Sequence, residues 1–269
     1  MTKRSISAGD EQRWSGIATA YERSFARLCA YPAARLLDAT GAMPGRRLLD
    51  VGTGTGTVAV LAAERGASVV AVDPDEDMLA VARPKDSRVT YVNAALPLLP
   101  FPDAAFHAVT ANFVINHVGD PRAALAEMVR VTRPKGILAV TIWPYPVSPL
   151  HQLFAEAVDA SAAILPPSHR LPTGLDFSRT EAGLADLLTA AGLRDVGASR
   201  LSWECRVDPE EWWAGPAGGV ATIGEIVTSQ SPQIAAAIKA NYDRLTRGYR
   251  DGDELVLPTA AILAFGIRR

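Results

Sequence analysis

The fold of this chain is decided by residues 48–57, LLDVGTGTGT. A short apolar run leads into this stretch, three alternating glycines follow an acidic residue, and a second apolar run, Val58 to Ala63, leaves it. The pattern predicts a buried strand, a tight turn and the beginning of a helix. Glycines suit such a turn, because the backbone bends sharply and a ligand can approach without meeting a β-carbon. The first turn of the helix adds unpaired N–H donors and the positive end of the helix dipole.

Two classes of ligand bind at turns of this kind. Dinucleotides are held by the pattern G-x-G-x-x-G, but here Gly56 comes one residue early and Thr57 takes the place of the last glycine. Asp50, at the end of the strand, would repel a phosphate and suits a cation. S-adenosylmethionine (SAM) has an ammonium and a sulfonium group and no phosphate. The residues therefore favour SAM over NAD.

The same residues resemble the first motif of the class I SAM-dependent methyltransferases, hh[D/E]hGxGxG, at every position. Within that family the chain is most similar to the UbiE-like, small-molecule enzymes. The resemblance implies an α/β, Rossmann-like fold with a seven-stranded, mostly parallel sheet in the order 3-2-1-4-5-7-6. The last strand would be antiparallel, with helices on both faces of the sheet and a helical lid. We expect Asp50, Gly52, Thr53 and Gly54 to bind the cofactor.

The length of 269 residues permits one domain, or a core with a small lid. We expect a single domain over residues 1–269, in which residues 1–41 form an N-terminal helical cover. Two insertions, 145–178 and 208–250, are expected to form a lid or a wall of the substrate pocket, because they are long for connections.

The N-terminal cover is predicted to begin with one helix over residues 10–28, whose apolar residues recur at three- and four-residue steps. Tyr21 lies on this apolar stripe. Its position before the core resembles that of a Trp…Tyr pair in UbiE-type enzymes, which implies contact with the cofactor. Packing against the body of the fold is the alternative.

Two further strands are expected to end near the cofactor. Residues 68–73 predict a strand that ends in Asp73, about 20 residues past the glycine turn, from where a carboxylate reaches a ribose. Asp73 could instead cap the next helix, and the two roles are compatible. Pro74 and Met78 follow, and Met78 could pack against adenine or in the core. Asn112 ends the fourth strand, at the edge where open α/β sheets bind ligands.

Residues 93–103 resemble the family's D-A-x-x-L-P-F-x-D stretch, with one departure. The family has an acidic residue that accepts a hydrogen bond from the adenine amino group, and here Ala94 or Ala95 occupies that region. We expect both alanines beside the adenine, which Asn93 or backbone groups would then hold.

Residues 113–121 resemble the family's L-x-L-H-H-V-x-D-P pattern, which implies that His117 lies beside the methyl group of the cofactor. An imidazole there can take a proton from a substrate hydroxyl near neutral pH. A histidine packed at the beginning of a helix is the alternative. His151 is the second candidate base. The expected wall of the substrate pocket contains Tyr145, His169 and Trp212.

The closing stretch, residues 259–267, predicts the last strand of the sheet. Pro258 is expected at its beginning, because proline has no N–H to donate to a neighbouring strand.

The composition limits the partners. Lys and Arg number 27 against 29 Asp and Glu, a net charge of −2, so no basic excess favours nucleic acid. Cys29 and Cys205 are the only cysteines, which predicts neither a disulfide framework nor a metal site. We find no signal peptide and no run long enough to span a membrane, and expect a cytoplasmic protein without a membrane partner.

The resemblance implies transfer of the methyl group of SAM to an O, N or C atom of a small, apolar metabolite by in-line displacement. One alternative is a protein of this fold that uses SAM without methyl transfer, as a cyclase or decarboxylase. Another is a SAM-binding protein without catalytic activity.

Overall fold

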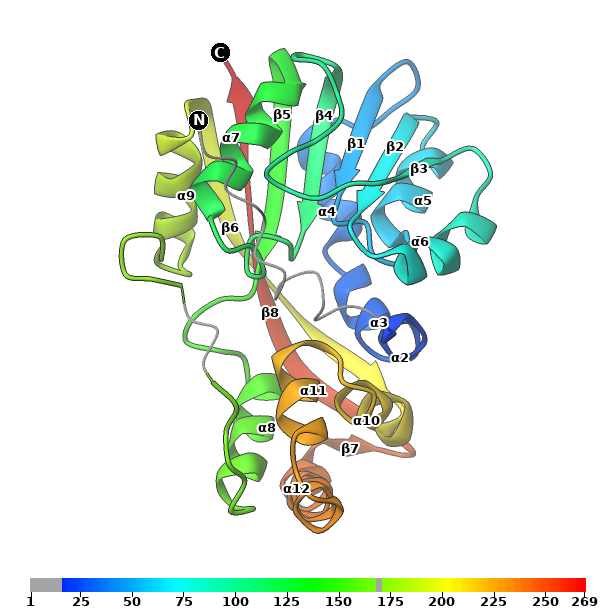
Figure 1. The fold of residues 1–269 in the computed structure, drawn as a ribbon, viewed down its shortest axis with the longest axis vertical. Coiled ribbons are helices and arrows are strands. Elements are labelled where there is room, and N and C mark those ends of the chain that lie inside the picture. Colours follow the sequence, from blue (N-terminus) through cyan, green and yellow to red (C-terminus); the bar gives the residue numbers. More distant parts are fainter. Residues whose placement is uncertain (1–15, 168–170) are drawn as a thin grey trace.

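The computed structural model describes residues 16–167 and 171–269. Its centre is a sheet in the order β3-β2-β1-β4-β5-β8-β6, with a short strand, β7, paired to β8 (Figure 1). The predicted order 3-2-1-4-5-7-6 is confirmed, because β8 occupies the place of the predicted seventh strand. The strands are β1 (Arg47–Val51), β2 (Ser68–Asp73), β3 (Thr90–Asn93), β4 (Phe106–Asn112), β5 (Thr132–Ile142), β6 (Leu193–Val207), β7 (Arg250–Asp251) and β8 (Glu254–Arg268).

Strands β1 to β5 run parallel, and β8 is antiparallel to both β5 and β6. The parallel strands β1 and β2 are buried at every position after the first, as expected for strands covered on both faces. Parallel strands bring their carboxyl ends to one edge of the sheet. That edge therefore carries the glycine turn after β1, Asp73 at the end of β2 and Asn112 at the end of β4.

Helices cover both faces of the sheet. Leu48 belongs to the cluster that packs under α4 and α5, whereas its neighbour Leu49 packs on the other face with α7 and α9, because side chains alternate along a strand. The helices are α2 (Ala18–Arg23), α3 (Phe25–Ala30), α4 (Ala33–Thr40), α5 (Thr57–Glu64), α6 (Glu76–Ala82), α7 (Pro121–Val131), α8 (Pro149–Asp159), α9 (Glu181–Ala190), α10 (Pro209–Ala217), α11 (Ala221–Thr228) and α12 (Pro232–Leu245), with short 3₁₀ helices at Arg83–Lys85 and Thr246–Tyr249.

The prediction of one helix over residues 10–28 is wrong within the described part. The segment forms two short helices, α2 and α3, which are separated at Ser24. The Ser24 hydroxyl donates to the Ala20 carbonyl at 2.6 Å, and such back-bonding by serine bends helices. Residues 10–15 lie outside the described residues.

Strands β6 and β8 extend well beyond the rest of the sheet. Pairing between β5 and β8 begins at Ile262, whereas β6 and β8 pair as far as Leu255. Helices α8, α10, α11 and α12 pack around this two-stranded extension and form a second layer of core below the sheet (Figure 1). Pro258 lies inside β8, opposite Glu204, and not at its beginning as predicted. A proline fits there because β5 does not reach this position, so no strand on that side needs its N–H.

Trp212 anchors the lower layer of core. Its side chain is fully buried, and its ring centroid lies 4.9 Å from that of Phe25 in α3. The expectation that Trp212 lines a substrate pocket is therefore wrong, because the side chain is enclosed between α3 and the helices of the second insertion. No helix in residues 16–167 and 171–269 is long and apolar enough to cross a membrane.

Replacing Trp212 by alanine is expected to lower the free energy of unfolding by about 3–5 kcal/mol, because a large buried side chain is removed. Chemical denaturation measures the change. Tyr145→Ala is the matched control: Tyr145 is 68% exposed, and its loss is expected to cost less than about 0.5 kcal/mol. Equal effects of the two substitutions would contradict the assignment of Trp212 to the core.

Candidate active site

The carboxylate of Asp50 lies beneath the glycine turn. Its two oxygens accept hydrogen bonds from the hydroxyls of Thr53, at 2.7 Å, and Thr110, at 2.8 Å. Burial raises the pKa of Asp50 to about 6, although these hydrogen bonds act in the opposite direction. Neither Asp50 nor Thr53 lines the cavity described below. The two side chains bond each other and hold the turn from below, so direct binding of the cofactor by Asp50 and Thr53 stays a prediction.

The turn itself needs glycine for two reasons. Gly52 and Gly54 have φ of 64° and 54°, a region that other residues adopt only with strain. A β-carbon on Gly52 would also lie 2.5 Å from Cγ2 of Val114. Both glycines line the cavity, as the motif predicts.

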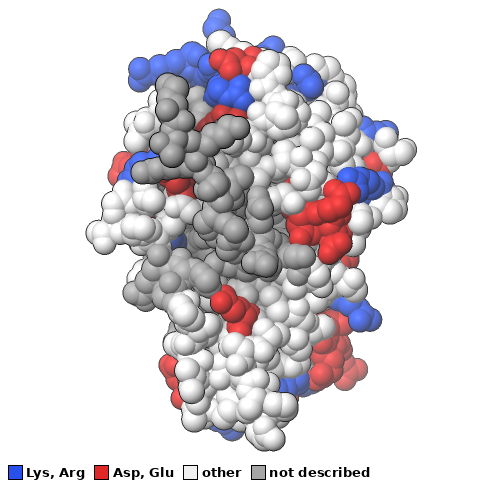
Figure 2. All heavy atoms as spheres, viewed as in Figure 1, with Lys and Arg blue, Asp and Glu red and all other residues white. Residues whose placement is uncertain are grey.

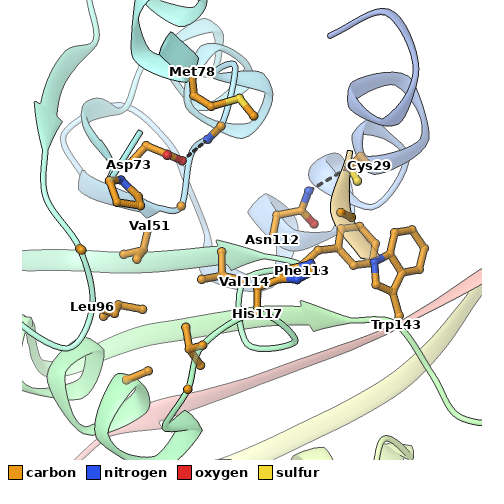
Figure 3. Close-up of a pocket in the computed structure, with 18 of the residues that line it drawn as sticks. Cys29, Val51, Asp73, Met78, Leu96, Asn112, Phe113, Val114, His117 and Trp143 are labelled. Carbon is orange, nitrogen blue, oxygen red and sulfur yellow. Dashed lines mark hydrogen bonds between the residues drawn. The ribbon is translucent and has the colours of Figure 1, made fainter. Parts of the chain in front are cut away.

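Asp73 holds the turn from the side. Its Oδ2 accepts from the backbone N–H of Gly54 at 2.7 Å (Figure 3), and its Oδ1 accepts from that of Asp75 at 3.0 Å. Burial raises the pKa of Asp73 to about 6. Asp73 is not a helix cap, since Asp75 occupies that position and accepts from the N–H of Met78. The Asp73 carboxylate lines the cavity.

A cavity of about 600 Å³ extends from the turn along the carboxyl edge of the sheet. Its size is typical of sites for a cofactor-sized ligand. Its charged or titratable lining residues are Asp73, Asp120, His117 and His151, besides Tyr21 and Cys29, and no Lys or Arg stands among the lining residues that the structure describes. This donor set suits a cationic cofactor without phosphate, and therefore fits SAM.

Figure 3 shows the two ends of this cavity. Asp73 and Met78 lie at one end, and Phe113 and Trp143 lie at the other. Pro74, Ala94 and Ala95 also line the cavity. The Asn93 amide donates to the Pro74 carbonyl at 2.9 Å, and Asn93 is not one of the residues that line the cavity.

The far end of the cavity is aromatic. The rings of Phe113 and Trp143 stack with centroids 3.9 Å apart and planes 17° from parallel, and the His151 ring meets Trp143 edge-on at 4.9 Å. Sequence analysis missed Phe113 and Trp143 as site residues. Each is the first residue after a parallel strand, β4 or β5, and this position was a usable signal.

Asn112 connects the N-terminal helices to the sheet. Its amide nitrogen donates to the Cys29 carbonyl at 2.8 Å (Figure 3), and its amide oxygen accepts from the Thr141 hydroxyl at 2.6 Å. Asn112 lines the cavity, and so does Tyr21, whose ring lies 3.6 Å from where a β-carbon of Gly54 would stand.

The remaining predicted residues divide into two groups. His117 and His151 both line the cavity. Tyr145 does not: its side chain points into solvent, and the prediction that it forms a pocket wall is wrong in this structure. His169 lies outside the described residues. Within those residues, no group of three or more His, Cys, Asp or Glu could hold a metal ion.

Comparisons with known proteins identify the family of the chain. A family model described as a methyltransferase domain matches residues 49–140. The demethylmenaquinone methyltransferase of Renibacterium salmoninarum is 40% identical over 122 residues, which cover 45% of this chain and 52% of that relative. The enzyme of the same name from Beutenbergia cavernae is 34% identical over 175 residues, 62% of this chain and 73% of the relative. This chain thus spans about half the length of the first relative and about three quarters of the second.

Among solved structures, the crystal structure of the [4+2]-cyclase SpnF matches with a TM-score of 0.53 and 26% identity, over 89% of this chain and 81% of that one. The chain belongs to the family of class I SAM-dependent methyltransferases. The relatives from Renibacterium salmoninarum and Beutenbergia cavernae are both named as methyltransferases.

Asp50→Ala is expected to lower the free energy of unfolding by about 1–3 kcal/mol, because two buried threonine hydroxyls lose their acceptor. SAM affinity is expected to fall with it, since the turn loses its support. Chemical denaturation and calorimetric titration measure the two effects. Asp50→Asn keeps one acceptor oxygen and is expected to have a smaller effect on both. Lost SAM affinity with unchanged stability would show instead that Asp50 contacts the cofactor directly.

Proposed function

We propose that this enzyme transfers the methyl group of SAM to a small, apolar acceptor with a planar ring. The observation that carries the proposal is the aromatic end of the cavity, where Phe113 and Trp143 stack beside the region expected to hold the methyl group. Aromatic rings favour offset stacking on other flat rings. The two relatives described above are named for demethylmenaquinone, so its reduced form is the first acceptor to test.

The proposed position of the cofactor follows from the end of the cavity near Asp73. The Asp73 carboxylate would accept hydrogen bonds from the ribose hydroxyls, while Gly52 and Gly54 leave room for the methionine part. Met78 and the alanines at 94 and 95 would pack against the adenine, and backbone groups would hold its polar edge. Tyr21 and Asn112 would lie over the methionine part of SAM.

The two insertions supply part of the proposed pocket wall. Leu175 and His151, from residues 145–178, line the cavity, and so do Ala221, Thr222 and Ile223, from residues 208–250. Tyr21, Phe25 and Cys29 line it from the N-terminal cover. These contacts support the assignment of residues 1–41 as a cover and of the insertions as walls of one domain.

The chemistry needs little from the protein besides alignment. When bound, SAM supplies a methyl group on a positive sulfur, which is already activated for displacement. The chain would hold the acceptor in line with that methyl group and exclude water, and such alignment can contribute about 7–11 kcal/mol to a reaction of this kind. The apolar, aromatic end of the cavity provides both functions.

A hydroxyl acceptor also needs a base, for which His117 and His151 are the candidates. The geometry favours His151. Its Nδ1 lies 3.1 Å from the Ser148 hydroxyl, and Nε2 has no hydrogen-bond partner within the described residues. Burial lowers the pKa of His151 to about 4, so the ring is neutral at pH 7 and can accept a proton.

The charge distribution is consistent with a small uncharged substrate. On the face shown in Figure 2, Lys and Arg side chains alternate with Asp and Glu, and the surface between them is mainly uncharged. We infer that nucleic acid is not the substrate, because its phosphates would require a basic surface.

The experiment that tests the proposed function is incubation of the enzyme with SAM and reduced demethylmenaquinone, followed by mass spectrometry. We expect a product heavier by one methylene unit, together with an equal amount of S-adenosylhomocysteine. A changed acceptor without S-adenosylhomocysteine would contradict methyl transfer and indicate that SAM is used as a fixed charge. No change in the acceptor would contradict the proposed acceptor class.

SAM affinity is expected to rise with pH between about 5 and 7 and then to level off. The pKa of Asp73 is raised to about 6, so the carboxylate loses a proton in this range and becomes a full acceptor for the ribose hydroxyls. Calorimetric titration at a series of pH values measures the change. Asp73→Asn should remove the pH dependence and weaken binding roughly 10- to 100-fold. Asp50→Asn is the control, because burial also raises the pKa of the Asp50 carboxyl to about 6. In this variant SAM affinity should still depend on pH. A flat profile in the unmodified enzyme would refute the role of Asp73.

His151→Ala is expected to lower kcat by roughly 100-fold or more, with the SAM dissociation constant unchanged, because the base is lost and the cofactor end of the cavity is intact. Steady-state kinetics and calorimetry measure the two quantities. His117→Ala is the comparison. A large loss in that variant and none in His151→Ala would transfer the role of base to His117.

A further inference from the structure

A second cavity lies beside the extended part of β6 and β8. It is open to solvent, has a volume of about 410 Å³, and is lined by the beginning of α8 and by both strands. Its one charged lining residue within the described part of the chain is Glu204. Ser148 and Thr259 line it as well, and both side chains are almost fully buried.

Three side chains connect the two cavities. His151 lines the active-site cavity, and its Nδ1 is 3.1 Å from the Ser148 hydroxyl. The Ser148 hydroxyl is in turn 3.3 Å from that of Thr259. Because Ser148 and Thr259 line the second cavity, a continuous line of hydrogen-bonding groups leads from the active site to an open surface.

The hydroxyl of Ser148 is available for this contact with His151 and Thr259, because it does not cap its helix. Ser148 is the N-cap of α8, where a serine side chain normally accepts from a backbone N–H in the first turn. Here it caps no backbone N–H, and the hydroxyl contacts His151 and Thr259 instead. The Ser148 carbonyl accepts the N–H of His151 at 3.0 Å, which fixes the two residues relative to each other.

We propose that His151, Ser148 and Thr259 form a proton relay that carries the proton of the acceptor hydroxyl from the active site to the second cavity. The inference rests on the proposed methyl transfer. This reaction releases one proton when the acceptor is a hydroxyl group, or a carbon that a neighbouring hydroxyl group activates. Ser148 and Thr259 are positioning residues in this relay, since they act through His151.

The relay conserves protons at every step. The O–H bond of the acceptor breaks as an N–H bond forms at Nε2 of His151. The proton on Nδ1 passes to the Ser148 oxygen, the proton of Ser148 passes to the Thr259 oxygen, and the proton of Thr259 leaves to water in the second cavity. Rotation of the two hydroxyls and a flip of the imidazole ring, which turns the protonated nitrogen back toward Ser148, restore the starting state.

A relay is needed because the active-site end cannot keep the proton. Burial lowers the pKa of His151 to about 4, so a charged imidazolium is unstable there. The other titratable side chains that line this cavity are Asp73, Asp120, His117, Tyr21 and Cys29. Ser148 is the side chain to which His151 is bonded.

The kinetic test compares variants with reduced demethylmenaquinone as the acceptor. Ser148→Ala and Thr259→Val are expected to lower kcat about 10-fold or more, with KM within twofold, whereas Ser148→Thr and Thr259→Ser keep the hydroxyl and most of the rate. Ser202→Ala, in the same cavity but outside the relay, should leave the rate unchanged. Added imidazole buffer should restore kcat in the slow variants and not change the unmodified enzyme, because a small base then removes the proton. Absence of rescue would overturn the relay, since a merely structural loss does not depend on buffer.

A second test needs no acceptor. The chain has four histidines, so the ring of His151 can be assigned by nitrogen NMR of histidine-labelled enzyme. Exchange of its ring proton with solvent is expected to be about 10-fold faster in the unmodified enzyme than in Thr259→Val, and equal to that in Ser202→Ala. Equal exchange in Thr259→Val would refute the relay whether or not the enzyme turns over. A fast exchange that depends on Thr259, without any product from reduced demethylmenaquinone, would support the relay and refute only the proposed acceptor.

Discussion

The hydrogen bond from the N–H of Gly54 to the carboxylate of Asp73, 2.7 Å long, is the contact on which the rest of the site depends. It fastens the turn after β1 to the end of β2, while Asp50 and its two threonine hydroxyls hold the same turn from below. Both carboxyls are buried, and for both the largest cause of the raised pKa is that burial. A cation bound nearby would favour their charged forms. The cost of burying two acids is therefore consistent with a site made for a positively charged cofactor.

The second determinant of the site is the length of β6 and β8. Because these strands continue past β5, they carry α8 and α10 to α12 to the carboxyl edge of the sheet, where open α/β folds bind ligands. The aromatic end of the cavity is thereby closed by residues far apart in the sequence. The same extension creates the second cavity, and α8 begins between the two. The aromatic end of the first cavity and the whole of the second therefore depend on one feature of the fold.

Local patterns predicted the half of the fold that is built from local units. The glycine turn and the apolar runs around it predicted β1, α5 and β2. Asp73 lies at the end of β2, as its spacing from the turn predicts. Asp50 shows that local patterns do not predict contacts with residues far away in the sequence. Its identity suggested a contact with a cation, but the partner that takes one of its oxygens, Thr110, is 60 residues away and nothing near Asp50 in the sequence indicates it.

The aromatic end of the cavity was predicted less well, because it depends on long-range packing. Trp212 and Tyr145 both had the aromatic character expected of a pocket wall, yet one is enclosed in the lower core and the other faces solvent. That difference is decided by how β6 and β8 extend, which no short motif encodes. Phe113 and Trp143 were predictable, because each directly follows a parallel strand. His117 and His151 were named as site residues from the sequence, whereas these two aromatic residues were not.

The measurement that tests the central claim most directly is calorimetric titration of the purified enzyme with SAM and S-adenosylhomocysteine, with NADH as the control. The site described here predicts micromolar binding of the first two ligands and none of NADH, because the cavity is lined by the buried carboxyl of Asp73 and, among its described lining residues, has no Lys or Arg for a pyrophosphate. Binding of NADH without binding of SAM would contradict the account.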